Sequence, residues 1–360
     1  MKIIILAGGK GERFWPFSRL TKPKQLLPIV SSKTMLEETI ERLEGLVKTE
    51  DIFISTRKDL VPPIKAIIKD FPDENFIIEP MPKDTAAAIG FAVTMVNKRS
   101  PGSVVAVLPA DHTIKEKDLF QKDLFNASRI AKETGCLITF GIQPTRISTG
   151  YGHIELGEII NDTYDTPAYE VKSFKEKPDY ATAKMYNEKG NFVWNSGMFI
   201  WTIPSIMEAI EKHMKELFEG LMQIQDVMDT DEEDRAVHDV FHALPRISID
   251  YGVMEHADNV LCLKSRFTWD DVGSWTALER VTGVDPDRNI IKSLWKGQDT
   301  KNSIIVSDGD LVVTLGVNNL IIVKSKNALL VMDKSREQEI KKIVEELSED
   351  EDLKKKFIDE

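Results

Sequence analysis

The sequence predicts an α/β protein built on a doubly wound, mostly parallel sheet, followed by a smaller C-terminal region of short strands. Short apolar runs alternate with helical patterns through the first 140 residues, which is typical of βαβ units. The first apolar run leads directly into a cluster of glycines. Past Asp285 the pattern changes to closely spaced apolar bursts. These three observations define the fold class.

The first half of the chain supplies the alternating elements. Strands are expected at residues 3–6, 51–55, 75–79, 103–108 and 136–140. Helices are expected from Leu36 to Val47, at residues 60–70, from Asp84, and at residues 117–134. Parallel strands need long crossovers, so this alternation predicts a sheet with helices on both faces.

The alternation ends near Gly150. Residues 149–154 form a glycine-flanked turn into a strand, and residues 169–174 alternate as its antiparallel partner would. Residues 192–201 are apolar apart from Asn195 and Ser196, a polar pair that needs partners from the backbone or from sugar hydroxyls. Residues 204–257 are expected to be largely helical, and residues 259–263 to form a strand.

The C-terminal region has a different pattern. Apolar bursts occupy residues 304–306, 311–313, 320–323 and 329–331. Their irregular spacing predicts short strands, as in a partial β-solenoid, and a final helix is expected at residues 337–347. We therefore divide the chain into a ligand-binding domain, residues 1–285, and a structural or subunit-contact domain, residues 286–360.

Composition narrows the class of protein. The 360 residues carry 47 basic and 59 acidic side chains, a net charge of −12, yet residues 10–24 hold five basic residues and one acid. A basic patch on an acidic chain favours a small anionic ligand over nucleic acid. No apolar run is long enough to span a membrane, and the first residues do not resemble a secretory signal. Cys136 and Cys262 lie in apolar contexts as core residues, so we expect a cytoplasmic protein.

The segment after the first strand is the leading candidate for a ligand site. It consists of Leu6, Ala7, Gly8, Gly9 and Gly11. Glycines there let backbone N–H groups turn towards an anion, and Arg13 and Lys24 add positive charge. Gly9 and Gly11 are too close together for a P-loop, and the dinucleotide fingerprint fails because position 14 is Phe. The alternative is an ordinary glycine-rich turn.

Other strands carry candidates at their carboxyl ends, where doubly wound sheets bind ligands. Glu79 and Pro80, followed by Thr85 and Ala86, would suit a flat base, with Glu79 accepting hydrogen bonds from an exocyclic amine. The alternative is a solvated strand-end charge. Asp111 directly follows a buried strand, where it would either bind Mg²⁺ near phosphates or cap a turn.

Two later segments extend this candidate site. Asp270 and Asp271 lie between tryptophans, and Asp271 is the more plausible partner for Asp111 on a metal, although spacing alone does not decide. Lys177 ends a predicted strand, so it either points into the cleft with Arg13 and Lys24 or is an ordinary surface lysine. For Asp250, binding a sugar hydroxyl and capping a helix remain alternatives.

Several motifs together resemble those of the sugar-1-phosphate nucleotidyltransferase family. In chain order they are AGGKGERFWPFSRLTKPKQLLP, EPMPKDTAAAIG, PADH, GYGHI, FKEKP, NSGMF and WDDVGSW. Within this family, the EP and PADH segments with NSGMF and SIDYGVME resemble the branch that uses mannose and guanine nucleotides. The resemblance implies a Rossmann-like mixed sheet, the nucleotide-diphospho-sugar transferase fold, with a small C-terminal β-helix-like domain.

The resemblance also implies roles for the candidate residues. Arg13, Lys24 and Lys177 would be catalytic, and Asp111 and Asp271 would bind Mg²⁺. The nucleotide would contact Leu6, Ala7, Gly8, Gly9, Gly11, Glu79, Pro80, Thr85 and Ala86. The sugar phosphate would contact Gly150, Glu176, Lys177 and Asn195.

The implied reaction transfers GMP from GTP to mannose 1-phosphate and releases pyrophosphate. We expect no nucleic-acid or membrane partner, and a homodimer. Two alternatives remain open: a relative with another base and sugar, such as a glucose-1-phosphate thymidylyltransferase, and a non-catalytic nucleotide-sugar sensor.

Overall fold

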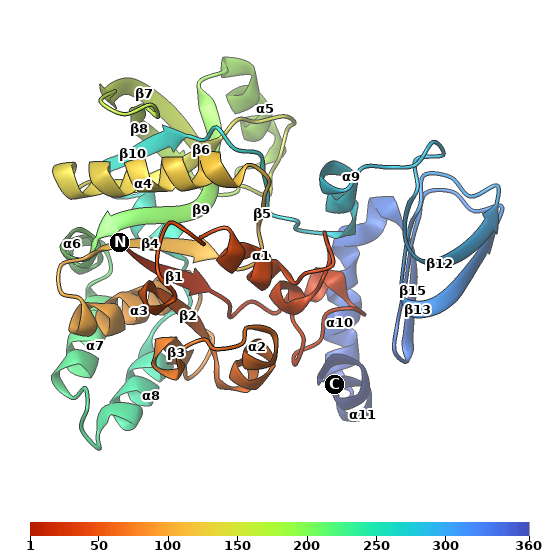
Figure 1. Ribbon diagram of the computed structural model, residues 1–360, viewed down its shortest axis with the longest axis horizontal. Helices are drawn as coiled ribbons and strands as arrows, with labels where there is room; N and C mark the ends of the chain where they lie inside the picture. The colour runs from red at the N-terminus through yellow and green to blue at the C-terminus, as the bar shows by residue number, and fades with distance from the viewer. Residues whose placement is uncertain (360) are drawn as a thin grey trace.

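A nine-stranded mixed sheet forms the centre of the computed structural model, which describes residues 1–359 (Figure 1). The strand order is β3-β2-β1-β4-β9-β6-β10-β8-β7. The strands are β1 (Lys2–Leu6), β2 (Ile52–Arg57), β3 (Phe76–Glu79), β4 (Val104–Pro109), β6 (Leu137–Ile142), β7 (His153–Asn161), β8 (Ala168–Lys175), β9 (Phe192–Thr202) and β10 (Val260–Lys264). β3, β2, β1 and β4 are parallel, and β9 runs antiparallel to both β4 and β6. The predicted mixed α/β class is confirmed.

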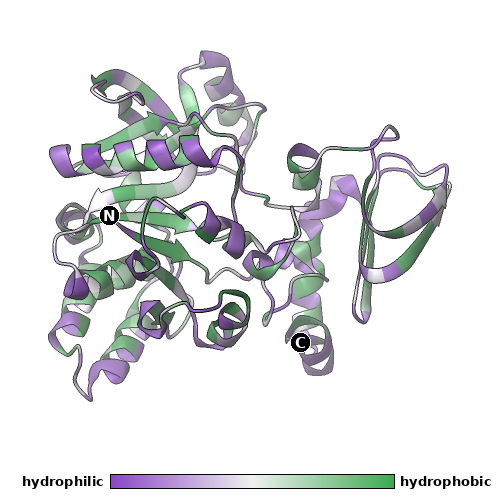
Figure 2. Cartoon of the chain, in the orientation of Figure 1, coloured by the Kyte–Doolittle hydropathy of each residue, from purple (hydrophilic) through white to green (hydrophobic). Residues whose placement is uncertain are grey.

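Helices cover both faces of this sheet. They are α1 (Met35–Glu41), α2 (Val61–Ile67), α3 (Thr85–Arg99), α4 (Lys117–Thr134), α5 (Tyr180–Lys189), α6 (Ile203–His213), α7 (Lys215–Asp226) and α8 (Glu233–Ala243). The short helix α9 (Leu278–Val281) lies apart from this sheet, and its Leu278 is buried in a cluster with Val272 and Ile290. Successive strand residues point to opposite faces. Ile4 therefore packs in the core with α3, whereas Ile3 and Ile5 pack in the core with α4. The central strands are hydrophobic and α4 is largely hydrophilic (Figure 2).

The first helix is shorter than expected. Thr34 and Glu37 form a capping box that starts α1, but α1 ends at Glu41 instead of continuing to Val47. Leu43 and Leu46 donate their amides to carbonyls three residues back, to Ile40 and Leu43 respectively. These tight turns keep Leu43 buried without a continuous helix, so the apolar spacing alone overestimated the helix length.

A second sheet lies at the far end of the molecule (Figure 1). It contains β12 (Ile290–Gln298), β13 (Ile304–Leu315), β14 (Leu320–Ser325) and β15 (Ala328–Asp333). The first three strands are parallel, and β15 is antiparallel to β14. The expectation of separate strands at residues 304–306 and 311–313 is wrong, because both belong to β13, which passes an irregularity in its pairing with β12. No strand is predicted over β12, because Lys292, Lys296 and Gln298 interrupt its apolar pattern.

The C-terminal helices return to the first loop of the chain. α10 (Ile340–Glu349) stands between the two sheets in Figure 1 and is followed by α11 (Glu351–Lys354). Ile340 and Val344 are buried against Trp15, whose Nε1 donates to the Phe357 carbonyl at 2.9 Å. Within residues 1–359, none of the helices has the length and hydrophobicity needed to cross a lipid bilayer.

A short two-stranded ribbon, beyond the carboxyl end of β4, joins two segments that are far apart in the sequence. β5 (Thr113–Ile114) pairs antiparallel with β11 (Trp269–Asp270), so that Thr113 lies opposite Asp270. The segment before β11 is fixed by Asp123 on α4, which is fully buried and accepts hydrogen bonds from the Arg266 backbone amide and guanidinium. Asp123 therefore positions the chain that leads into β11.

We predict that Asp123→Ala lowers the free energy of unfolding by about 3 kcal/mol, because Arg266 keeps its partly buried charge but loses its partner. Urea denaturation followed by circular dichroism measures the change. Lys132→Ala, an exposed site on the same helix, is the control and should change the value by less than about 0.5 kcal/mol. Equal stabilities of the two variants would contradict the positioning role of Asp123.

Candidate active site

The glycine loop after β1 is held in shape by neighbouring side chains. Gln25 Nε2 donates to the carbonyls of Ala7 at 2.7 Å and Gly9 at 3.1 Å. Thr56 Oγ1 also donates to the Ala7 carbonyl, at 3.1 Å. Gln25 is not among the predicted site residues, and its position beside Lys24 is the only feature of the sequence that points to it. These bonds fix the loop where the first strand ends.

Gly11 permits a close approach of the loop to Lys24. Its φ of +67° is in the left-handed region, and a Cβ at this position would lie 2.4 Å from Lys24 Cβ. Any other residue would therefore push the loop away from Lys24. Lys24 itself is buried, with only 6% of its surface exposed.

The Lys24 ammonium joins three segments of the chain. Nζ donates to Asp111 Oδ2 at 2.7 Å and to the backbone carbonyl of Asp271 at 2.6 Å. Asp111 follows β4, and Asp271 follows β11. The pairing of Thr113 with Asp270 explains why these two aspartates, 160 positions apart, meet at one lysine.

The Asp111 carboxylate is held in its ionised form. Burial acts to raise its pKa, but the charges of Lys24 and His112 and the hydrogen bond from Lys24 outweigh burial and leave the pKa below its usual value. The His112 ring is held in position by a hydrogen bond, which its Nδ1 accepts from Trp269 Nε1 at 3.1 Å. With 35% of its side chain exposed, the Asp111 carboxylate remains accessible to a ligand.

The two adjacent aspartates have different surroundings. Asp270 accepts hydrogen bonds from Arg280 Nε at 2.6 Å and from the Val272 amide at 2.8 Å. Asp271 Oδ1 accepts from the Tyr151 hydroxyl at 2.7 Å, and burial together with the Asp271 charge raises the pKa of Tyr151. Val272 has a φ of +44°, an unfavourable value for a β-branched residue. The two carboxylates therefore have different partners, and of the two residues it is Asp271 that bonds Lys24, through its backbone carbonyl.

These groups surround one pocket of about 270 Å³. Its lining includes Gly11, Arg13, Lys24, Asp111 and Asp271. Arg13 Nη1 lies 3.5 Å from the Gly273 carbonyl, at the limit of a hydrogen bond. The structure therefore brings together two of the three predicted catalytic cations and both predicted metal ligands.

The donor set of this pocket fits Mg²⁺ bound together with phosphate. Within residues 1–359 no group of three or more His, Cys, Asp or Glu side chains is arranged to hold a metal ion. Mg²⁺ commonly uses one or two protein carboxylates and completes its shell with water and substrate phosphates. Ionised Asp111 and the neighbouring Asp271 supply such a pair, and the remaining ligands would come from phosphate.

A second polar cluster contains the predicted sugar-phosphate residues. Asn195 Nδ2 donates to Asp250 Oδ1 at 2.8 Å, and Glu176 Oε1 lies 2.8 Å from Lys177 Nζ. Gly152 packs against both Glu176 and Asn195, with its would-be Cβ 2.5 Å from Glu176 Oε2. Gly150 is exposed, and its amide donates to Ser148 Oγ. Gly152, rather than the predicted Gly150, therefore lies beside Glu176 and Asn195.

Asp250 belongs to this cluster by its contacts. It lies within a helical turn, Asp250–Met254, and its carboxylate bonds Asn195 across the chain. Burial, followed by the charge of Glu176, raises the pKa of Asp250 to about 7. A carboxyl group with such a pKa changes its charge in the physiological range. Sequence reasoning left its role open because this contact spans 55 positions.

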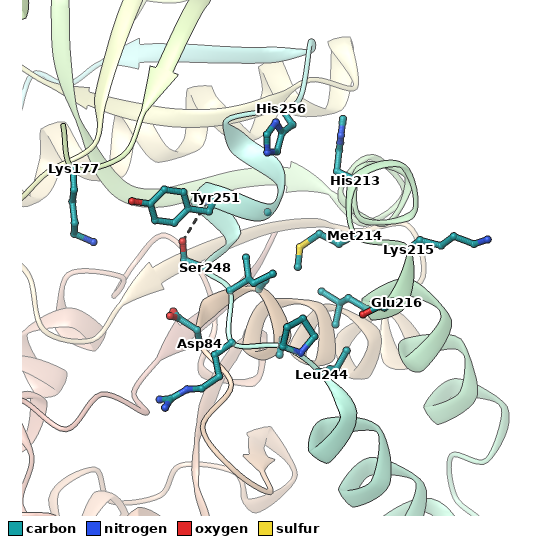
Figure 3. A pocket seen from close by; sticks show the side chains of 17 residues that line it. Asp84, Lys177, His213, Met214, Lys215, Glu216, Leu244, Ser248, Tyr251 and His256 are labelled. Atoms are coloured by element: carbon teal, nitrogen blue, oxygen red, sulfur yellow. Dashed lines mark hydrogen bonds between the residues drawn. The ribbon is translucent and has the colours of Figure 1, made fainter. Parts of the chain in front are cut away.

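Lys177 lies in a separate and larger cavity of about 830 Å³ (Figure 3). Lys177 and Tyr251 lie at one end of this cavity, and Met214 and Lys215 lie at the other (Figure 3). Lys177 is absent from the lining of the pocket that contains Lys24. The expected convergence of Lys177 with Arg13 and Lys24 on one pocket is therefore not observed among the described residues.

The predicted base-binding residues lie at the ends of β3 and the start of α3. Glu79 is buried, accepts a hydrogen bond from Ser55 Oγ at 2.9 Å, and has its pKa raised by burial. It lies 3.6 Å from the point where a Cβ on Gly8 would be, so it borders the glycine loop. The alternative of a solvated strand-end charge is wrong. Pro80 is exposed, and Ala86 lines the larger cavity.

Known proteins are similar to this chain in sequence and in fold. A family described as nucleotidyl transferase matches residues 2–287, and the MannoseP isomerase/GMP-like beta-helix domain matches residues 297–347. The chain therefore belongs to the nucleotidyl transferase family, and the predicted resemblance is confirmed.

Within this family the chain is similar to mannose-1-phosphate guanylyltransferases. That of Escherichia coli K12 is 35% identical over 353 residues, which cover 96% of this chain and 73% of the relative. That of Klebsiella pneumoniae is 36% identical over 350 residues, which cover 96% and 74%. A Thermus thermophilus structure, described as a mannose-1-phosphate geranyltransferase, is 35% identical with a TM-score of 0.85 and covers 96% of this chain and 99% of that protein.

The pKa of Asp250 predicts a pH-dependent stability. Its folded pKa of about 7 exceeds the unfolded value of about 3.9, so its protonated form favours folding and this contribution is lost as pH rises from about 4 to 7. Asparagine does not ionise, so Asp250→Asn abolishes this pH-dependent loss of stability. The free energy of unfolding of the variant, relative to that of the natural protein, should therefore rise progressively between pH 4 and pH 7, and the difference should stay constant above pH 7.

Urea denaturation at a series of pH values measures this difference. Asp73→Asn, at a side chain that is 78% exposed, is the control and should give no such trend. A stability difference for Asp250→Asn that is independent of pH would show that Asp250 does not titrate in this window.

Proposed function

We propose that the protein transfers GMP from GTP to α-D-mannose 1-phosphate, forming GDP-mannose and pyrophosphate. The observation that carries the proposal is the meeting of Lys24, Asp111 and Asp271 beside the glycine loop. It occurs in a chain that is 35% identical to a mannose-1-phosphate guanylyltransferase over 96% of its length. An anion pocket with two carboxylates suits a nucleoside triphosphate that arrives with Mg²⁺.

In this reaction the two substrates react directly with each other, and the protein forms no covalent intermediate. A phosphate oxygen of the sugar phosphate attacks the α-phosphorus of GTP, and the bond from that phosphorus to the β-phosphate bridging oxygen breaks. The attacking oxygen is already anionic at neutral pH, so no general base is required. The protein must align two anions and stabilise the charge on the departing pyrophosphate.

The pocket residues suit this task. Arg13 and Lys24 would stabilise negative charge on the phosphates, and Lys24 would also hold Asp111 and Asp271 in place. Asp111 and Asp271 would hold Mg²⁺, which when bound neutralises phosphate charge. Glycines 8, 9 and 11 would let the phosphates approach the backbone.

The remaining predicted residues would bind the two organic groups. Leu6, Ala7, Glu79, Pro80, Thr85 and Ala86 would border the guanine, with Glu79 as the acceptor for its amino group. Gly150, Glu176, Lys177 and Asn195 would bind the sugar phosphate, and Asp250 joins them through its bond to Asn195. Because Lys177 lines another cavity, we propose that it binds the sugar phosphate and does not contact the leaving group.

We also propose a homodimer formed by residues 286–360, with residues 1–285 as the catalytic domain. Large aliphatic side chains on β12, β13 and β15 are more than half exposed. They are Leu294, Leu311, Val313, Leu315, Leu329 and Val331. Leu294 and Leu311 lie opposite each other on β12 and β13, and contiguous apolar surface commonly marks a protein interface. The cytoplasmic location stays a prediction.

Asp111→Asn tests the proposed reaction. We predict that kcat falls at least about 100-fold while GTP affinity changes by less than about threefold, because the carboxylate acts mainly where charge develops. Pyrophosphate release measures kcat, and calorimetry measures GTP binding. Asp73→Asn is the control. Near-natural turnover of Asp111→Asn would remove Asp111 from the reaction.

The natural protein should be assayed in parallel against several nucleoside triphosphates and sugar 1-phosphates. GTP with mannose 1-phosphate should give the highest kcat/KM. A higher value for dTTP with glucose 1-phosphate would support the thymidylyltransferase alternative. Nucleotide binding without any turnover would support the sensor alternative.

Self-association is tested by the double variant Leu311→Lys and Leu315→Lys. We predict that the natural protein has the mass of two chains in solution and that the variant has the mass of one, since two charges are expensive to bury in an apolar interface. Light scattering after gel filtration gives both masses. Met185→Lys, at an exposed apolar residue of α5, should remain dimeric. A natural protein with the mass of one chain would contradict the proposal.

A further inference from the structure

The C-terminal helix reaches the pocket that contains Lys24 and Asp111. Lys341, in the first turn of α10, lines this pocket with Arg13 and Asp271. Lys341 belongs to residues 286–360, for which the sequence predicts a structural or subunit-contact role and no ligand chemistry. The structure therefore supplies a cation from a part of the chain that carries none of the predicted motifs.

The packing of α10 fixes the place of Lys341. Ile340 and Val344, four residues apart, form one face of the helix and are 2% and 5% exposed. They pack with Trp15, on the loop that follows Arg13. Lys341 directly follows Ile340, so the packing of this face fixes the backbone of Lys341 beside the loop.

Further contacts hold the C-terminal segment to the same loop. The Leu20 amide donates to the Ile358 carbonyl at 2.9 Å, and the Arg19 guanidinium donates to the Phe357 carbonyl. Glu337, one turn before Lys341, accepts hydrogen bonds from the Thr276 amide at 3.1 Å and hydroxyl at 2.7 Å. The helix is therefore tied both to the segment after Arg13 and to the segment after Asp271.

The lysines that line the pocket differ in whether an acidic side chain lies close to their ammonium groups. Lys24 is paired with Asp111, and Lys10 lies 3.7 Å from Glu12. Within residues 1–359, no carboxylate oxygen lies within 4.0 Å of the Lys341 ammonium. Lys341 is exposed, whereas Lys24 in the same pocket is buried.

We propose that Lys341 binds the β- and γ-phosphates of the nucleotide and, after transfer, the pyrophosphate. This assignment rests on the proposed function. The carboxylates near Lys24 mark the centre of phosphoryl transfer, and the terminal phosphates of a triphosphate extend away from that centre. The exposed ammonium of Lys341, which has no carboxylate partner among residues 1–359, would meet them in this pocket and form charge-assisted hydrogen bonds. The C-terminal helix thereby completes the phosphate site.

The test compares Lys341→Ala with Lys342→Ala, its exposed neighbour on α10 that does not line the pocket. Calorimetry with Mg²⁺ and pyrophosphate gives the affinity directly. We expect about tenfold weaker pyrophosphate binding for Lys341→Ala, equivalent to about 1.4 kcal/mol, and an unchanged value for Lys342→Ala. The KM for GTP should rise similarly, whereas the KM for mannose 1-phosphate should not change.

Equal pyrophosphate affinities of Lys341→Ala and the natural protein would overturn the proposal. Lys341→Arg keeps the charge and should retain most of the affinity, which separates charge loss from disruption of α10. If the natural protein turned over no nucleotide at all, the proposed function would fail, but the difference in pyrophosphate affinity would still report whether Lys341 belongs to the anion pocket.

Discussion

The pocket lined by Arg13, Asp111 and Asp271 depends on the buried ammonium of Lys24. It is paired with Asp111 and hydrogen-bonded to the backbone of Asp271, so one charge connects the glycine loop, the end of β4 and the turn after β11. Removing a charge from water is costly, and only a paired, hydrogen-bonded geometry offsets that cost. Both partners of Lys24 are within 2.7 Å, and Gly11 gives the loop the close approach that this geometry requires. The remaining features of the site are arranged around this interaction.

The fold brings these segments together by simple means. β1 and β4 are adjacent and parallel, so the loops after them leave the same edge of the sheet. The β5–β11 ribbon then places Asp271 beside the segment that carries Asp111. The C-terminal region covers this edge from outside, where Phe14 and Trp275 pack with Ile304 and Ile321 of the small sheet. The small sheet and α10 are thus part of the environment of the site, besides their proposed role in self-association.

The sequence predicted the parts of the site that lie at strand ends. Asp111 follows the apolar strand β4, and Arg13 follows β1 through the glycine loop; the geometry of parallel sheets brings such residues to one edge. Contacts made by irregular or distant segments had no such signal. Tyr151 reaches Asp271 across 120 positions, and Lys341 reaches the pocket through the packing of Ile340 and Val344. Lys177 was expected beside Arg13 because both follow strands, but its strand, β8, lies near the opposite end of the sheet from β1.

Hydrogen exchange of the segment at residues 269–275 in Lys24→Met tests the central role of Lys24 most directly. If the ammonium holds this segment to Asp111, its amides should exchange at least about tenfold faster than in the natural protein, while those of α4 should not change. Unchanged exchange in both segments would show that the turn carrying Asp271 keeps its place without Lys24, and would contradict this account of the pocket.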